Sequence, residues 1–150
     1  MNTRGIVDLI DRIRDRANTI IVGELKSRGI TDILPAHGRA LAALYEAEGP
    51  IPIKEVTEST GRVKSTMTVM IRTLEKNGYV TRTPCSDDGR SVLVSLTEKG
   101  RRLFPAFQEI SNLLIDAVYG DMSGGERELL VGLLVRMDEN LASYLPHADG

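Results

Sequence analysis

Residues 64–82 read KSTMTVMIRTLEKNGYVTR and carry the repeat of an amphipathic helix that runs into a turn. At about 100° per residue, one face holds the apolar residues Val63, Met67, Met70, Ile71 and Leu74. The opposite face holds Ser65, Thr68, Val69, Arg72 and Lys76. Gly78 is the residue type preferred just after a helix. The pattern therefore predicts a helix over 63–77 with one buried face and one exposed face.

The polar face of this helix has the chemistry that reads duplex DNA. Hydroxyl groups bond to phosphates or base edges, valine touches the thymine methyl, and arginine reads guanine through N7 and O6. The alternative is an ordinary amphipathic helix whose polar face contacts only solvent. The segments on either side of the helix distinguish these two interpretations.

Those flanking segments predict a helix-turn-helix followed by a wing. Residues 53–60 have the pattern of a short helix. After the longer helix the period changes to that of strands, over 79–83 and 91–96, joined by the turn Ser86-Asp87-Asp88-Gly89. A short helix, a turn and a longer helix form a helix-turn-helix, and the hairpin that follows forms the wing. This context favours DNA binding.

The tip of the predicted hairpin offers a second DNA contact. Arg90 follows the turn, where an arginine can enter the narrow minor groove. Asp88 is expected to brace the Arg90 guanidinium through a charge-assisted pair. The alternative is a surface turn with an ion pair of little energetic weight. Cys85 has no partner cysteine in its own chain, so we interpret it as a bystander rather than an oxidation sensor.

The rest of the chain is predicted to be helical. Helical repeats cover 6–28, the segment from Pro35 to Gly49, 98–118, and the segment from Ser123 to about 145. Pro105 is expected to kink the third of these helices, and Ser123 and Glu126 form a capping box at the start of the last. The last helix is expected to turn these residues inward: Leu129, Leu130, Leu133, Leu134, Met137, Leu141 and Leu145. The apolar stripes of the terminal helices exceed the needs of a small winged lobe, so we expect them to pair with a second chain.

Composition narrows the classes of function. The chain has 150 residues and a net charge of −2, divided into +5 over residues 62–102 and −7 elsewhere. A basic segment in an acidic chain fits a local electrostatic contact with nucleic acid. Two histidines, one cysteine and no glycine-rich phosphate loop after a strand argue against an enzyme, a cofactor and a metal site. No apolar run reaches the ~18 residues of a membrane span, so we expect a cytoplasmic protein with no membrane partner.

Two motifs resemble those of a known family. The stretch from Lys64 to Arg82 is similar to the recognition helix and first wing strand of the MarR family of winged-helix transcriptional regulators. The stretch Asp88-Gly89-Arg90-Ser91 and the later Leu96-Thr97-Glu98-Lys99-Gly100 are similar to the wing motif of that family. Val69 departs from the resemblance, because many members carry a polar or basic residue there.

The expected fold is mainly α with a small β-hairpin wing, in one domain over 1–150. A winged helix-turn-helix lobe occupies about 33–100, and dimerisation helices occupy about 5–30 and 101–146. The DNA-binding residues are expected to be Lys64, Ser65, Thr66, Thr68, Arg72, Lys76, Arg82 and Arg90. Lys64 and Arg82 are expected to contact the DNA backbone and Arg90 the minor groove, while the others act in the major groove or on its phosphates.

The resemblance implies a homodimer that represses or activates genes under the control of a small, often aromatic or anionic ligand. His37 is a candidate for the ligand site, and a capping or surface histidine is the alternative interpretation. We expect a ligand-responsive repressor that binds a pseudo-palindromic double-stranded site, with half-sites ~34–36 Å apart. The alternative function is a winged-helix protein-interaction module without sequence-specific DNA binding.

Overall fold

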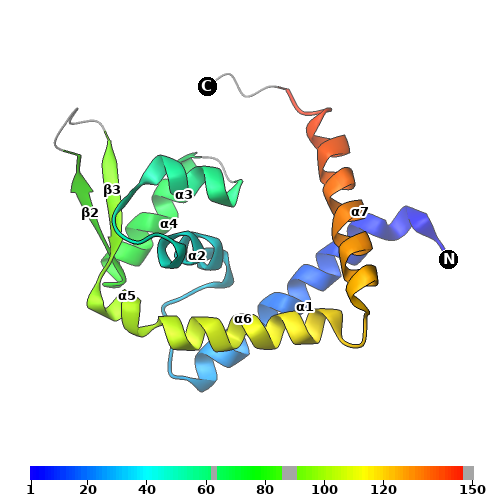
Figure 1. The fold of residues 1–150 in the computed structure, drawn as a ribbon, viewed down its shortest axis with the longest axis horizontal. Helices are drawn as coiled ribbons and strands as arrows, with labels where there is room; N and C mark the ends of the chain where they lie inside the picture. Colours follow the sequence, from blue (N-terminus) through cyan, green and yellow to red (C-terminus); the bar gives the residue numbers. More distant parts are fainter. Residues whose placement is uncertain (62–63, 86–90, 147–150) are drawn as a thin grey trace. The chain divides into compact units, whose positions relative to one another are not determined.

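The computed structural model describes residues 1–61, 64–85 and 91–146, and Figure 1 shows their course. The helices are α1 (Ile6–Ser27), α2 (Gly38–Glu46), α3 (Ile53–Thr60), α4 (Lys64–Lys76), α5 (Glu98–Arg102), α6 (Phe104–Tyr119) and α7 (Gly124–Ala142). Short 3₁₀ turns, η1 (Thr3–Gly5) and η2 (Pro35–His37), precede α1 and α2. The strands are β1 (Ile51–Pro52), β2 (Val80–Pro84) and β3 (Val92–Leu96). This mainly helical architecture with a small sheet confirms the predicted fold class.

The three strands form one antiparallel sheet in the order β1-β3-β2. The hairpin register runs from Val80 opposite Leu96 to Pro84 opposite Val92. Strand β1 was not predicted, and it adds to the other edge of β3 by pairing Ile51 with Val94. Figure 1 shows α2, α3 and α4 gathered on one side of the β2–β3 hairpin.

The core of this winged segment confirms the predicted faces of α4. Met67, Ile71 and Leu74 are buried, whereas Val69 is 62 % exposed. The largest fully buried side chains are Leu41, Leu44, Met67, Ile71, Leu74, Val56, Val80 and Val94. Because they come from α2, α3, α4 and the sheet, one continuous core fixes α4 to the β2–β3 hairpin.

The predicted end of α4 is also confirmed. Gly78 has φ +83°, the left-handed conformation that favours glycine. Its N–H donates to the Glu75 carbonyl (3.0 Å), and the Tyr79 N–H donates to the Leu74 carbonyl (2.9 Å). These bonds satisfy carbonyls that the end of the helix leaves without an intrahelical donor, and they direct the chain into β2.

The predicted helix over 98–118 is divided into α5 and α6 at Leu103. Pro105 lies in the first turn of α6, where a missing N–H costs little. Within α5, Gly100 is buried, and its carbonyl accepts a hydrogen bond from Tyr45 Oη (2.7 Å). A Cβ at Gly100 would lie far inside van der Waals contact with the Tyr79 carbonyl oxygen. Only a residue without a side chain lets α5 approach the start of β2 this closely.

The described chain forms two compact units, residues 1–114 and 115–150. In the second unit, Ser123 Oγ accepts the Glu126 N–H (3.3 Å) and the Ser123 N–H donates to the Glu126 carboxylate (2.7 Å), which confirms the capping box. The helix ends at Ala142 rather than near 145. The expected inward leucines are wrong for a single chain, because Leu129 and Leu141 are each 63 % exposed. Their exposure leaves an apolar surface on α7 in the single chain.

Candidate nucleic-acid interface

The outward face of α4 presents the residues that the sequence singled out. Ser65, Arg72 and Lys76 are exposed, and Thr66 and Thr68 are half-buried. Val69 stands in the middle of this face, where an apolar side chain can touch a thymine methyl. The helix therefore offers hydroxyl, apolar and cationic groups along one surface.

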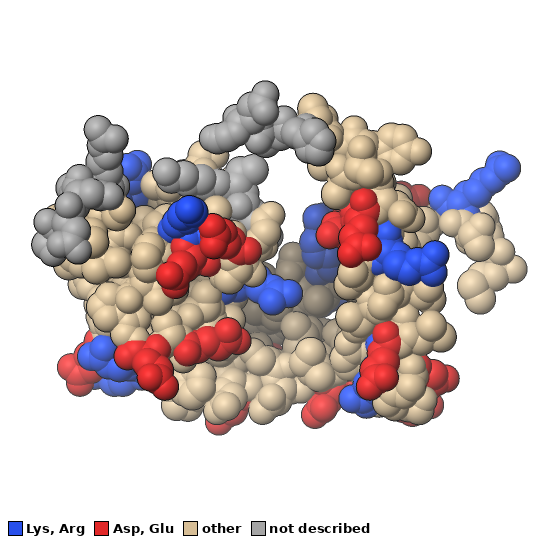
Figure 2. All heavy atoms as spheres, turned by 45° about the horizontal axis from the view of Figure 1, so that its top comes forward, with Lys and Arg blue, Asp and Glu red and all other residues tan. Residues whose placement is uncertain are grey.

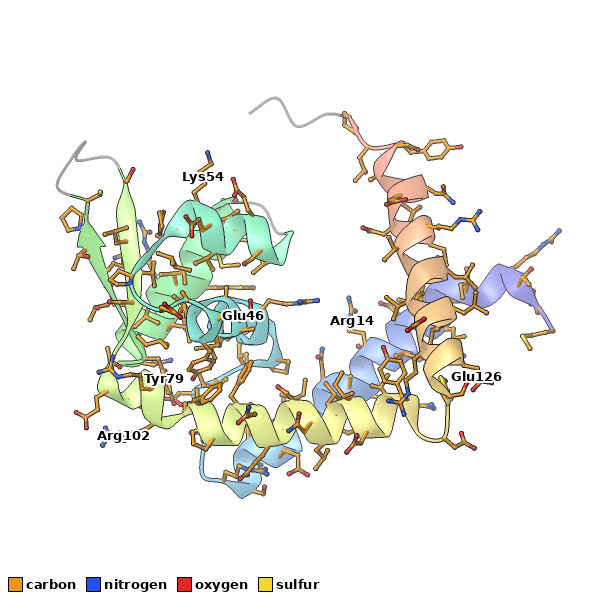
Figure 3. All side chains as sticks on the ribbon, viewed as in Figure 1. Arg14, Glu46, Lys54, Tyr79, Arg102 and Glu126 are labelled. Carbon is orange, nitrogen blue, oxygen red and sulfur yellow. The ribbon has the colours of Figure 1, made fainter. Side chains whose placement is uncertain are left out.

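A groove of about 400 Å³ adjoins this face between α3, α4 and the sheet. Three of its lining residues are cations from three elements: Lys54, Arg72 and Arg82. Lys54 was not predicted as a site residue, although its place just after Pro52 in the first turn of α3 is visible in the sequence. It points outward from α3 (Figure 3). A concave surface lined by cations suits a phosphate.

Arg82 is held by hydrogen bonds to Glu75. Its Nε and NH2 donate to Glu75 Oε1 (3.1 and 3.0 Å), and its backbone N–H donates to Glu75 Oε2 (3.2 Å). The side-chain hydrogen bonds from Arg82 lower the pKa of the Glu75 carboxyl below its ordinary value. Arg82 thus lines the groove with its charge partly balanced, and its role on the DNA backbone stays a prediction.

Other predicted contacts lie outside the described residues. Asp88 and Arg90 belong to 86–90, and the Lys64 side chain is likewise outside the description.

On the face shown in Figure 2, acidic side chains lie beside basic ones. The positive charge of residues 62–102 therefore does not make this face uniformly basic.

A second hollow lies in the first unit, between α1, α2 and α6. Apolar side chains line this cavity of about 90 Å³, including Leu25, Leu34, Leu41 and Phe107, together with the polar Ser111. Within residues 1–61, 64–85 and 91–146, no cluster of histidine, cysteine and carboxylate residues suits a metal ion. The cavity is thus a hydrophobic site rather than an ionic one.

His37 lies in the sequence between Pro35 and Gly38, two residues that line this cavity. His37 is 3 % exposed, and its Nδ1 accepts the Leu34 backbone N–H (3.0 Å). Burial lowers the pKa of the ring below its ordinary value. The geometry is that of a neutral capping histidine, the alternative that the sequence left open. Its role in ligand binding stays a prediction.

The comparisons with known proteins agree with this winged architecture. The MarR family model matches residues 34–92. The HTH-type transcriptional regulator SarZ of Staphylococcus haemolyticus is 31 % identical over 102 residues, which cover 68 % of each protein. The chain belongs to the MarR family. It is accordingly a transcriptional regulator and not an enzyme.

Two solved structures have the same fold. A mutant MarR from E. coli complexed with operator DNA superposes with a TM-score of 0.74 at 22 % identity, covering 91 % of this chain and 99 % of that one. BpsR of Bordetella bronchiseptica, whose DNA binding is regulated by 6-hydroxynicotinic acid, superposes with a TM-score of 0.74 at 24 % identity, covering 89 % of this chain and 92 % of that one.

Among the described helices, none combines the length and hydrophobicity needed to cross a bilayer.

Proposed function

We propose that this MarR-family chain binds duplex DNA sequence-specifically, with α4 in the major groove. The observation that carries the proposal is the outward face of α4, whose hydroxyls, valine and arginine stand beside a groove lined by Lys54, Arg72 and Arg82. Ser65, Thr66, Thr68 and Arg72 face the base edges or nearby phosphates. Lys54, Lys64, Lys76 and Arg82 hold phosphates. The E. coli relative of the same fold, complexed with operator DNA, supports this use of the fold.

The wing supplies a further contact in this proposal. Arg90 enters the minor groove with Asp88 as its support, as the sequence predicts. Replacing Arg90 with alanine weakens operator binding and reduces the preference for A·T pairs beside the core site. Wild-type affinity of that variant would contradict the wing contact.

The active form in our proposal is a homodimer on a pseudo-palindromic site. The apolar faces of α1 and α7 support this, because Ile13 is 51 % and Leu129 is 63 % exposed in the single chain. Such surfaces are rare on monomeric soluble proteins. The helices over about 5–30 and 101–146 form the dimerisation lobe, and the lobe over about 33–100 binds each half-site.

We place a small-molecule effector in the apolar cavity, and its binding releases the repressor from DNA. The cavity has space for a compact ligand, since its volume of about 90 Å³ exceeds that of one water. BpsR, a relative of the same fold with a small-molecule regulator, supports this assignment. A regulator that acts on operator DNA in this way works in the cytoplasm, where we place the protein.

The decisive experiment is selection of bound duplexes from a random pool with the full chain. The proposal predicts enrichment of two related half-sites about one helical turn apart, ~34–36 Å. Enrichment without symmetry would contradict the dimer, and no enrichment would contradict sequence-specific binding. A chain that instead retains a partner protein and no duplex would be a protein-interaction module.

A further inference from the structure

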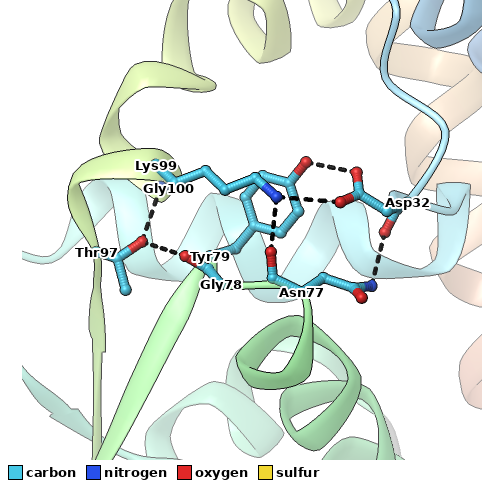
Figure 4. A network of polar contacts seen from close by, with 7 residues as sticks. All are labelled: Asp32, Asn77, Gly78, Tyr79, Thr97, Lys99 and Gly100. Atoms are coloured by element: carbon cyan, nitrogen blue, oxygen red, sulfur yellow. Dashed lines mark hydrogen bonds and ion pairs between the residues drawn. The ribbon is translucent and has the colours of Figure 1, made fainter.

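Asp32, in the loop between α1 and η2, contacts the C-terminal end of the recognition helix. Tyr79 Oη donates to Asp32 Oδ1 (2.6 Å), and Asn77 Nδ2 donates to the Asp32 backbone carbonyl (3.2 Å). These bonds join segments that are 45 and 47 residues apart in the sequence. Figure 4 shows the carboxylate and the carbonyl of Asp32 on the same side of this junction.

Lys99 of α5 completes the junction. Its Nζ contacts Asp32 Oδ2 (3.2 Å) and donates to the Asn77 carbonyl (2.7 Å). The same ammonium lies 4.3 Å from the centre of the Tyr79 ring. One cation therefore contacts the Asp32 carboxylate, the Asn77 carbonyl just after α4 and the Tyr79 ring just before β2.

The charges of the junction favour a fixed geometry. Burial alone would raise the pKa of the Asp32 carboxyl, but hydrogen bonds from Tyr79 and Lys99 outweigh it and lower the pKa. Burial and the bond to Asp32 raise the pKa of the Tyr79 phenol. At neutral pH Asp32 is thus ionised and Tyr79 keeps its proton. Hydrogen bonds between such groups are short and strong.

The position of Asp32 distinguishes it from a DNA contact. A carboxylate is repelled by phosphates, and its partners Asn77 and Tyr79 follow the end of α4 rather than belong to its outward face. Ser65 lies roughly 18 Å from Asn77 along the helix axis at 1.5 Å per residue. A tilt of about 5° at the held end would move Ser65 by roughly 1.5 Å, enough to break a hydrogen bond to a base.

We propose that Asp32 is a positioning residue that sets how α4 enters the major groove. It does so by fixing the C-terminal end of α4 to the loop after α1 and to α5. The proposal rests on the proposed function, since it requires a specific operator. The same loop continues into Ile33 and Leu34, which line the apolar cavity, so the junction also connects the cavity wall to the recognition helix.

The test compares wild type with Asp32→Asn, Tyr79→Phe and the double variant on the selected operator and on a scrambled duplex. We expect each single variant to raise the operator Kd by about tenfold, the size of effect expected for one hydrogen bond to a charged group. The Kd for scrambled DNA and the dependence of binding on salt stay as in wild type, because no phosphate contact is lost. The double variant loses less than the two single effects combined, since both weaken or remove the same bond between Tyr79 and residue 32.

Three controls keep these outcomes distinct. Glu48→Gln removes one exposed negative charge of the winged segment without touching the junction, and it should leave the ratio of the two Kd values unchanged. Thermal unfolding shows that each variant is folded, and both substitutions are nearly isosteric. Equal losses on both duplexes, or no loss on the operator, would overturn the positioning role. A wild-type chain that binds the two duplexes equally would instead contradict the proposed function, and the inference with it.

Discussion

The carboxylate of Glu75 on the recognition helix accepts three hydrogen bonds from Arg82 on the first wing strand, two from the guanidinium and one from the backbone N–H. This pairing joins α4 to β2, and the Glu75 carboxylate balances part of the positive charge that Arg82 brings to the groove. The bonds lower the pKa of Glu75, so its carboxylate is ionised at neutral pH. The charge available to DNA is thus set by partners within the protein as well as by the number of cations.

Replacing Arg82 with alanine should therefore change the salt dependence of DNA binding less than replacing Lys76 does. In a Glu75→Gln background the guanidinium loses its anionic partner, so Arg82→Ala should then reduce the salt slope by about 1, the value for one phosphate contact. The measurement is log Kd against log salt concentration for the four variants. If Arg82→Ala changes the salt slope by the same amount in the wild-type and Glu75→Gln backgrounds, Glu75 does not restrain Arg82.

Arg72→Ala should relax base preference. Arg72 is exposed on the outward face of α4, and loss of a bidentate contact to guanine costs about 1–3 kcal/mol at that base pair alone. Competition with single-base variants of the selected operator measures this change. An unchanged order of preference among the variants would assign Arg72 to the phosphates instead.

Lys54→Ala should weaken binding to all duplexes alike. Lys54 lines the groove beside α4 and projects from the first turn of α3, so it meets a phosphate rather than a base. We expect the salt slope to fall by about 1. Lys26→Ala, in the last turn of α1, is a matched control whose slope should equal that of wild type. A sequence-dependent loss at Lys54 would contradict the assignment.

Acid should destabilise the fold partly through His37. Burial lowers the pKa of the folded ring, so below about pH 6.5 the unfolded chain binds the proton more readily. This contribution to stability is present above pH 6.5 and declines as the pH falls toward the folded pKa. His37→Asn keeps a capping acceptor and should flatten the decline in Tm between pH 7.5 and 5.5. His147→Asn controls for the other histidine, and a profile unchanged by His37→Asn would refute the prediction.

Charged substitutions on α7 should dissociate the proposed dimer. Leu129→Glu combined with Leu141→Glu places carboxylates on the exposed apolar face of that helix, where pairing with a second chain would bury them unpaired. Sedimentation should then show monomers and operator affinity should fall. The matched control Asp138→Asn, on an exposed polar residue of α7, should remain dimeric. A dimeric Leu129 and Leu141 double variant would place the interface elsewhere.

Local patterns predicted most of the elements because their causes lie within a few residues. The two faces of α4 follow from its period, its end follows from Gly78, and the start of α7 follows from Ser123 and Glu126. Strand β1 escaped prediction because two residues have no period, and only pairing with Val94 makes them a strand. The break in the predicted helix over 98–118 was expected at Pro105 but lies at Leu103, because Pro105 is tolerated in the first turn of α6.

The site was predicted in part for the same reason. Residues on one face of α4 share a helix, so their spacing reveals them. Lys54 reaches the groove only because α3 packs beside α4, and Asp32 meets Lys99 across 67 residues of sequence. Contacts of this kind depend on the assembled core and leave no periodic signal.

The close approach at Gly100 separates positions that a protein engineer can vary from one that must stay fixed. Ser65, Val69 and Arg72 are exposed, so their side chains can be exchanged without disturbing the interior, and under the proposed function such changes would alter operator preference. Gly100 faces the Tyr79 carbonyl with no space for even a methyl group. A library aimed at new DNA targets can therefore randomise the exposed positions of α4, provided that residue 100 stays glycine.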